Sequence, residues 1–368
     1  MGVKSIEYKE EVKEVKKRQT TQIDEELRKI LESKKAEIKV IGVGGAGGNT
    51  ISRLTQIGIV GAETIAVNTD AQDLLYTDAD TKVLIGKELT GGLGAGADPK
   101  IGAEAAKESK DDIKKVVEGA DMVFVTCGLG GGTGTGAAPI VADIAKKSGA
   151  LTVGVVTLPF TMEGKQRMAN AQEGLENLQT IADTLIIIPN DKLLEIVPDV
   201  SITTAFKVAD EILVNSVKGI TELITKPGLV NLDFADVRAV MGSGGLAMIG
   251  MGESDTENRA LEAVEKSLNN PLLDVDIEGA TGALVNVAGG EDITIKECQE
   301  IVEAVTSKLN PDAKIIWGAQ IIKELGDTIR TMLIVTGVKS PNLFSVEKKL
   351  STAKQREIER VLGIDFVE

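Results

Sequence analysis

The segment "GLGGGTGTGAAP", Gly128 to Pro139, has the composition of a loop that binds anions. Six of its first nine residues are glycine, and none of its residues is charged. Glycine lets a ligand approach the backbone closely, and a glycine run between a strand and a helix directs N–H groups and the positive end of the helix dipole at one point. Such a loop suits a nucleotide phosphate, and the hydroxyls of Thr133 and Thr135 would add donors.

Two further glycine loops follow predicted strands, "GVGGAGGN" (42–49) and "TGGLGAGADP" (90–99). The first contains G-x-G-x-x-G at Gly42, Gly44 and Gly47, and together with Asp70 it also fits an NAD-binding fold. An NAD-dependent dehydrogenase is therefore one alternative. A dinucleotide needs one such loop, whereas three loops at the carboxyl edge of one sheet suit the many anionic oxygens of a triphosphate.

The three loops lack the lysine of the common phosphate-binding pattern. The motif G-x-x-x-x-G-K-[ST] does not occur, and no basic residue stands among the glycines. The phosphate charge must then be met by N–H groups, hydroxyls, helix dipoles and a cation such as Mg²⁺. We expect this cation to be held mainly through phosphates and water, without a direct side-chain ligand.

The composition excludes several classes of protein. The 368 residues carry a net charge of −15 and no histidine, so neither a Ser-His triad nor a His-ligated zinc site can be built, and nucleic acid is disfavoured as a partner. Cys127 and Cys298 lie far apart in sequence, which fits reduced thiols. The N-terminus is charged, and no apolar run approaches the length of a membrane span. We expect a cytoplasmic protein that meets the membrane only indirectly.

Short apolar runs alternate with helical stretches from Glu37 onward. Strands are predicted at 38–43, 64–69, 82–86, 122–128, 151–159 and 184–190. Strands that alternate with helices predict an α/β fold with a mainly parallel, Rossmann-like sheet covered on both faces. The glycine loops would then lie along one edge of this sheet.

A long amphipathic run at 203–225, ended by Lys226-Pro227-Gly228, predicts a central helix. Fewer strands follow it, and the last two are adjacent, which predicts a second, smaller α/β domain with a mixed sheet. The expected order is a charged helical arm, a nucleotide-binding domain, the central helix, a C-terminal domain, and a C-terminal helix and tail. Their predicted ranges are 1–37, 38–202, 203–226, 227–338 and 339–368.

The motif "GGGTGTG" (130–136) resembles the signature of the tubulin superfamily. Six further motifs match the FtsZ family: "GVGGAGGN", "NTD" (68–70), "GLGAGADP", "TMEGKQR" (161–167), "IPND" (188–191) and "NLDFADVR" (231–238). They occur in the family's order between about residues 38 and 338. The resemblance implies the tubulin/FtsZ-like fold, hydrolysis of GTP to GDP and phosphate, and head-to-tail protofilaments in a division ring at mid-cell. A tubulin-like GTPase that sets cell shape is the alternative.

The resemblance also assigns site residues. The implied nucleotide-binding residues are Gly44, Gly45, Ala46, Gly47, Gly48 and Asn49 in the first loop, Gly94, Ala95 and Gly96 in the second, and Gly128, Gly131, Gly132, Thr133 and Gly134 in the third, most of them as phosphate contacts. Glu163 and Arg167 correspond to the ribose partners, and Asn190, Phe206 and Asp210 to the guanine contacts. The side-chain chemistry agrees, because Phe206 and Asp210 share one helix face and a carboxylate accepts both N1–H and N2–H₂ of guanine.

None of these residues is an obvious base for orienting a water molecule. By the same resemblance, the loop 229–238 of the next subunit completes the GTPase centre: Asp233 and Asp236 polarise the water and Asn231 helps to position it. The local sequence also fits a simple helix start, with Asp233 as N-cap and Asp236 at the third helical position. Hydrolysis would then depend on assembly, and a head-to-tail contact that does not close gives filaments.

The expected partners are further copies of the chain and division-ring adaptor proteins. The segment "VLGIDFVE" (361–368) pairs apolar with acidic residues, which suits a short docking peptide for such adaptors. A frayed chain end is the alternative for this segment.

Overall fold

The computed structural model describes residues 36–196, 201–226, 229–230, 232–273, 277 and 279–338, which belong to one compact unit. The predicted arm (1–37), apart from its last two residues, lies outside the described residues, as do the predicted C-terminal helix and tail (339–368) and Asn231.

Six parallel strands form one part of the sheet, in the order β3-β2-β1-β4-β5-β6. They are β1 (Ile38–Val43), β2 (Ala62–Asn68), β3 (Thr81–Leu84), β4 (Met122–Gly128), β5 (Leu151–Leu158) and β6 (Thr184–Pro189). The sequence predicted each of them, with ends that differ by two residues or fewer. All of β5 and nearly all of β4 is buried, as expected for strands covered on both faces.

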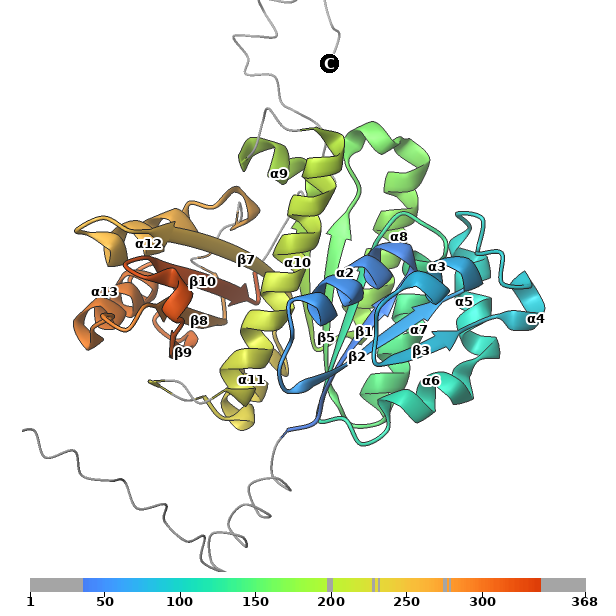
Figure 1. Cartoon of the computed structure of the whole chain (residues 1–368), viewed down its shortest axis with the longest axis horizontal. Helices are drawn as coiled ribbons and strands as arrows, with labels where there is room; N and C mark the ends of the chain where they lie inside the picture. Colours follow the sequence, from blue (N-terminus) through green and yellow to red (C-terminus); the bar gives the residue numbers. More distant parts are fainter. Residues whose placement is uncertain are drawn as a thin grey trace, which may run out of the picture. The chain divides into compact units, whose positions relative to one another are not determined.

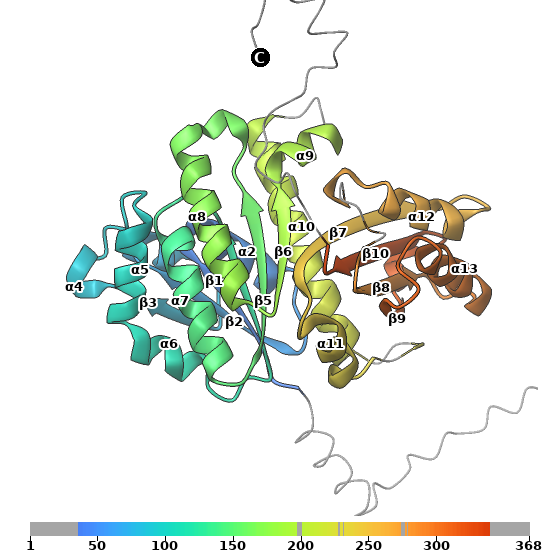
Figure 2. The ribbon, with the colours of Figure 1, turned by 180° about the vertical axis from the view of Figure 1, so that it is seen from behind.

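Helices cover both faces of these strands. Figures 1 and 2 show α2 (Gly44–Gln56) and α10 (Ile202–Thr225) on one face, and α5 (Pro99–Glu108), α6 (Lys110–Val117), α7 (Thr133–Lys147) and α8 (Lys165–Ile181) on the other. Successive side chains of β4 enter different cores, because side chains alternate along a strand. Phe124 packs in the core that contains Leu54 of α2, and Val123 and Val125 pack in the core that contains Ala137 of α7.

The C-terminal strands continue the same sheet. They are β7 (Gly245–Ser254), β8 (Gly282–Gly289), β9 (Lys314–Ile321) and β10 (Ile329–Thr336). β10 is antiparallel to both β7 and β8, and β9 is parallel to β8, so this part is mixed as predicted. A separate smaller sheet was expected, but β7 also pairs with β6 from Thr184 to Ile186, which gives one sheet of ten strands. Strand pairing between distant segments leaves no local pattern from which this could be predicted.

The long helix α10 contacts both parts of the sheet. It packs against α2 and β5, and also against β8 and β9. Its start is capped by Ser201, whose hydroxyl accepts a hydrogen bond from the backbone N–H of Thr204 at 3.2 Å. The remaining elements are α3 (Ala71–Tyr76), α4 (Lys87–Thr90), η1 (Thr161–Glu163), α9 (Asn190–Ile196), α11 (Phe234–Met241), α12 (Arg259–Leu268), η2 (Pro271–Leu273), α13 (Ile295–Thr306) and η3 (Lys323–Leu325).

The two cysteines are free and buried, which agrees with the prediction of reduced thiols. Burial raises the pKa of the Cys127 thiol to about 12. Over the described ranges, no helix combines the length and the apolar character needed to cross a membrane.

Candidate nucleotide site

The three glycine loops meet at the carboxyl edge of the parallel strands. A Cβ placed on Gly44 would lie 2.9 Å from the backbone nitrogen of Gly134, so the first loop touches the third. A Cβ on Gly132 would lie 2.8 Å from the Cβ of Ala95, so the third loop touches the second. These close approaches require glycine, because any larger residue would separate the backbones.

The helices α2 and α7 begin in this region without a capping side chain. Val43 precedes α2 and Gly132 precedes α7, neither side chain bonds to its helix, and neither helix has an acidic residue in its first turn. By contrast, Asp70 and Asp98 cap the helices α3 and α5. The first N–H groups of α2 and α7, with the positive ends of both helix dipoles, are thus left available to an anion.

Side chains hold the loops in register. The hydroxyl oxygens of Thr69 and Thr133 lie 2.6 Å apart and join the end of β2 to the third loop. Asn170 of α8 donates its side-chain amide to the carbonyls of Ala97, at 3.3 Å, and Gly130, at 3.4 Å, so it joins the second loop to the third. Neither Thr69 nor Asn170 was predicted as a site residue from the sequence. Thr69 stands within the "NTD" motif, whereas no sequence signal marks Asn170.

Charged and aromatic residues form a cluster near the ends of β5 and β6. The Nε of Arg167 lies 2.9 Å from the Oε2 of Glu163. Glu163 also accepts a hydrogen bond from the backbone N–H of Phe160 at 2.8 Å. The rings of Phe160 and Phe206 meet edge to face with centroids 5.1 Å apart, which joins η1 to α10. Phe206 remains 41% exposed, so one side of its ring is free to stack on a base.

A further carboxylate, Asp191, fixes the position of η1. It accepts hydrogen bonds from the backbone N–H of Thr161 at 3.0 Å and from the Thr161 hydroxyl at 2.5 Å. Because η1 contains Glu163, this contact holds the predicted ribose partner against the start of α9. Asp191 belongs to the "IPND" motif, but its role was not predicted from the sequence.

Two polar side chains, one at the start of α9 and one on α10, have no hydrogen-bond partner for their acceptor oxygens among the described residues. Asn190 is 4% exposed, and its Oδ1 has no hydrogen-bond partner in the described part of the chain. A buried acceptor left unsatisfied costs about 1–3 kcal/mol, which favours a ligand donor at this position. Asp210 is half-buried, and its side chain forms no hydrogen bond or ion pair with any described residue. Burial, with a smaller repulsion from Glu211, raises the pKa of Asp210 to about 6.

Asp233 and Asp236 form a reciprocal cap at the start of α11. Asp233 accepts a hydrogen bond from the backbone N–H of Asp236 at 2.8 Å, and Asp236 accepts one from the N–H of Asp233 at 3.4 Å. The predicted helix start at these residues is therefore confirmed. Their predicted catalytic contacts, and those of Asn231, are not tested by the structure.

The helix α11 lies at the opposite edge of the sheet from the glycine loops (Figure 1). Arg238 of α11 donates to the carbonyls of Asp121 and Gly149, at 3.3 and 3.4 Å, and these residues stand one position before β4 and two positions before β5. The glycine loops follow the strands instead. β4 has seven residues, so about 20 Å separates the two edges. One chain therefore does not bring Asp233 and Asp236 to its own loops.

The described residues contain no group of three or more His, Cys, Asp or Glu side chains that could hold a metal ion. Hydroxyls, amides and backbone N–H groups line the loops, and two carboxylates lie beside them: a Cβ on Gly45 would be 3.4 Å from the Oδ2 of Asp73, and a Cβ on Gly94 would be 3.7 Å from the Oδ2 of Asp70.

Two family models match the chain. The GTPase domain of the tubulin/FtsZ family matches residues 37–198, and the C-terminal domain of the FtsZ family matches residues 245–339. This match excludes the dehydrogenase alternative that the G-x-G-x-x-G pattern and Asp70 had suggested. Asp70 instead accepts hydrogen bonds from the backbone N–H groups of Gln72 and Asp73, as the cap of α3.

Curated relatives are similar over nearly their whole length. Cell division protein FtsZ 1 of Thermococcus kodakarensis is 63% identical over 351 residues, which cover 95% of this chain and 94% of the relative. Cell division protein FtsZ of Methanothermobacter thermautotrophicus is 59% identical over 345 residues, which cover 93% of this chain and 91% of the relative.

Solved structures agree in fold. The empty FtsZ dimer of M. jannaschii matches with a TM-score of 0.83 at 63% identity, covering 86% of this chain and 92% of the other. The GTPγS-bound protofilament of CetZ2 from Haloferax volcanii matches with a TM-score of 0.71 at 23% identity, covering 89% of this chain and 99% of the other. The second likeness shows a shared fold alone.

Proposed function

The chain belongs to the tubulin/FtsZ family and is a GTPase, and on this premise we propose that it is a cell-division protein whose copies assemble head-to-tail into protofilaments. Each GTP would be hydrolysed where two copies meet. One observation carries this proposal: the glycine loops and the carboxylates of α11 lie at opposite edges of one sheet. Stacking copies along the strand direction brings the second edge of one copy to the first edge of the next.

The nucleotide would bind across the carboxyl edge. The uncapped starts of α2 and α7 would face the phosphates, and Thr133 would add a hydroxyl. Arg167 and Glu163 would contact the ribose, and Phe206 would stack on guanine. Asp210 would accept the N1–H and N2–H₂ donors of guanine, and Asn190 would offer its unpaired Oδ1. Mg²⁺, when bound, would neutralise phosphate charge and would be held through the phosphates and water.

The next copy would supply what this edge lacks. Phosphoryl transfer depends mainly on alignment and charge stabilisation, so a water-orienting group contributed by a neighbour can give a large gain in rate. Asp233 and Asp236 are both exposed, and their capping hydrogen bonds leave other carboxylate lone pairs free. We assign them to polarising the attacking water, with Asn231 beside it.

The cellular setting and the remaining partners follow from the same premise. The protein would act in the cytoplasm at the mid-cell division site and would reach the membrane only through adaptor proteins bound to its C-terminal segment. The domains would be 38–202 for nucleotide binding, 203–226 for the central helix and 227–338 for the C-terminal domain with the loop 229–238.

The direct test is the GTPase rate per subunit as a function of protein concentration, recorded with light scattering. We expect the rate to rise together with scattering above a threshold concentration. A constant rate from dilute to concentrated protein would mean that each copy holds a complete active site.

The substitution Asp236→Ala should leave GTP binding and assembly intact and slow hydrolysis about 10²–10⁴-fold, the usual contribution of a positioned acid or base. Asp236→Asn is the matched control, because its amide oxygen can still accept the hydrogen bond from Asp233 while the charge is gone. If the capping role alone mattered, the asparagine variant would hydrolyse GTP normally.

Mixing two variants tests whether the carboxylates of α11 act in the nucleotide site of the neighbouring copy. Asp236→Ala has an intact nucleotide site, and Asp210→Ala has an intact α11. A mixture of the two should hydrolyse GTP faster than either variant alone, because copies of the second complete the sites of the first. No gain in the mixture, with both variants incorporated in filaments, would refute the arrangement.

A further inference from the structure

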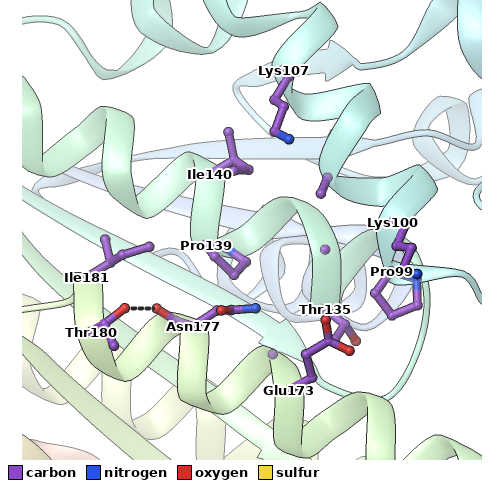
Figure 3. A pocket seen from close by; sticks show the side chains of 13 residues that line it. Pro99, Lys100, Lys107, Thr135, Pro139, Ile140, Glu173, Asn177, Thr180 and Ile181 are labelled. Atoms are coloured by element: carbon purple, nitrogen blue, oxygen red, sulfur yellow. Dashed lines mark hydrogen bonds between the residues drawn. The ribbon is translucent and has the colours of Figure 1, made fainter.

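A groove of about 270 Å³ lies between α5, α7 and α8. Its apolar walls come from Pro99, Pro139, Ile140 and Ile181, as Figure 3 shows. Pockets that hold whole small molecules usually measure about 300–1,000 Å³. This groove is smaller and open on one side, so it suits one large apolar side chain of a peptide.

The rim of the groove carries a positive charge on its α5 side. Lys100 and Lys107 stand there, and Glu173 and Asn177 stand on the α8 side (Figure 3). Lys107 is paired with Glu104 at 2.7 Å. The side chain of Lys100 forms no ion pair or hydrogen bond with any residue that the structure describes, so its charge is available to an occupant. An acidic residue next to a large apolar one would match this rim.

The floor of the groove touches the back of the phosphate-binding region. Thr135 lines the groove, and its hydroxyl accepts a hydrogen bond from the backbone N–H of Gly130 in the third glycine loop at 2.8 Å. Pro139 cannot donate the regular helical hydrogen bond to the Thr135 carbonyl. That carbonyl faces α8, since a Cβ on Gly174 would lie 3.3 Å from it. The floor thus offers a backbone acceptor beside the apolar walls.

We propose that the groove binds the C-terminal peptide of the same chain, residues 363–368, "GIDFVE". Phe366 would enter the groove, and Asp365 would approach the unpaired Lys100. The peptide has the composition that the groove suits, a large apolar residue with acidic residues on both sides, Asp365 and Glu368. Apolar burial would give affinity, and the carboxylate would fix the orientation of the peptide.

The chain leaves the described structure close to this groove. The backbone N–H of Val338 bonds to the Leu246 carbonyl at 3.3 Å, and Gly245 bonds to the Asp183 carbonyl at 3.0 Å. Asp183 is two residues after Ile181, which lines the groove. The 24 residues from 339 to 362 would span roughly 25–35 Å either as a coil or as a helix, enough to place the peptide in the groove.

Tethering makes weak binding sufficient. A short flexible connection gives an effective concentration in the millimolar range, so a peptide with a Kd near 0.1 mM in free solution would be mostly bound when attached. An adaptor protein that binds the same peptide more tightly would release it. The groove would thereby hold the docking peptide until such a partner is present.

Photo-cross-linking in the full-length chain tests this inference. With benzoylphenylalanine at position 366, we expect cross-links to peptides that contain Ile140 or Ile181. The same probe at Phe344, the other aromatic residue of the segment 339–368, is the matched control and should not label the groove. Cross-links from position 366 that scatter over other surfaces, or that equal those from position 344, would overturn the proposal.

Charge reversal checks the named contact. Lys100→Glu, an exposed substitution, should reduce the groove cross-link several-fold, and the added change Asp365→Lys should restore it. Failure of the restoring change would contradict the pairing of these residues.

Mixing ¹⁵N-labelled and unlabelled chains distinguishes a peptide of the same chain from a peptide of another copy. Cross-links within one isotopic copy support the proposal, and cross-links mainly between copies would overturn it in favour of docking between molecules.

Discussion

Protonation of Asp210 should weaken nucleotide binding between pH 7 and pH 5. The pKa of this carboxyl is about 6 in the empty site, because burial disfavours its charge and Glu211 lies close. Only the carboxylate accepts both donors of guanine. The ionised fraction falls from about 0.9 at pH 7 to about 0.1 at pH 5, so the apparent Kd for GDP or GTP should rise about tenfold.

Substitutions set the scale of this effect. A hydrogen bond to a charged group contributes about 1.5–3 kcal/mol, so losing two such bonds in Asp210→Ala should raise the Kd roughly 10²- to 10⁴-fold. Asp210→Asn retains one acceptor and does not titrate. Its affinity for guanine nucleotides should fall less, and xanthosine nucleotides, which offer an acceptor in place of the N2 amine, should gain relative to guanosine ones.

The assay is equilibrium titration with a fluorescent guanine nucleotide at pH 5, 6, 7 and 8, at constant ionic strength and below the assembly threshold. The nucleotide phosphates also titrate in this range, but they contribute equally to the wild type and to Asp210→Asn. The difference between the two pH profiles therefore isolates Asp210. Identical profiles would refute the assignment of this carboxylate to the base.

The same pKa predicts the opposite effect on the empty protein. The folded-state pKa of about 6 lies above the ordinary value of 3.8, so the folded state binds this proton more tightly. The free energy of unfolding therefore falls as the pH rises from about 4 to about 6, because the buried carboxyl loses its proton. The whole destabilisation by the buried charge is present above pH 6. Asp210→Asn should raise the free energy of unfolding at pH 7 by up to about 3 kcal/mol, measured by urea denaturation without nucleotide.

Three further outcomes can be checked with the same material. Gly132→Ala should lower the Tm and abolish GTP binding, because its Cβ would lie 2.8 Å from that of Ala95, whereas Gly131→Ala, whose Cβ meets nothing within 4 Å, should melt like the wild type. Asn190→Ala should weaken GTP binding about tenfold without lowering the Tm of the empty protein. The substitution removes a buried acceptor that has no partner among the described residues. A lower Tm would mean that the side chain supports the fold. Cys127 should resist iodoacetamide at pH 8 until the protein unfolds, because its pKa is about 12 and its side chain is buried. Mass spectrometry measures the modification, and alkylation of the folded protein would contradict this prediction.

The strands and the anion-binding character of the loops could be predicted from sequence because both depend on neighbouring residues. The run of β-branched and aliphatic residues in β5 is strand-forming wherever it lies, and it is wholly buried as predicted. The capping pair Asp233 and Asp236 could also be predicted, since a helix cap involves residues three positions apart. Interactions between residues this close in the chain can be recognised in the amino-acid sequence itself.

The site needed contacts between residues far apart in the chain, and these were set by packing. Thr69 meets Thr133 only because β1 lies between β2 and β4, and Asn170 reaches two loops only because α8 packs beside α7. The raised pKa of Asp210 depends on which elements bury it, and a lone Asp in a sequence carries no such information.

The amino-acid sequence by itself determined which segments can form strands, helices and phosphate-binding loops, because these properties follow from local backbone freedom and side-chain periodicity. Only the tertiary structure decided that three glycine loops meet at one edge while the α11 carboxylates stand at the other. Strand order and direction fix this separation, and they arise from the burial of two apolar faces across the whole sheet, which no local segment encodes.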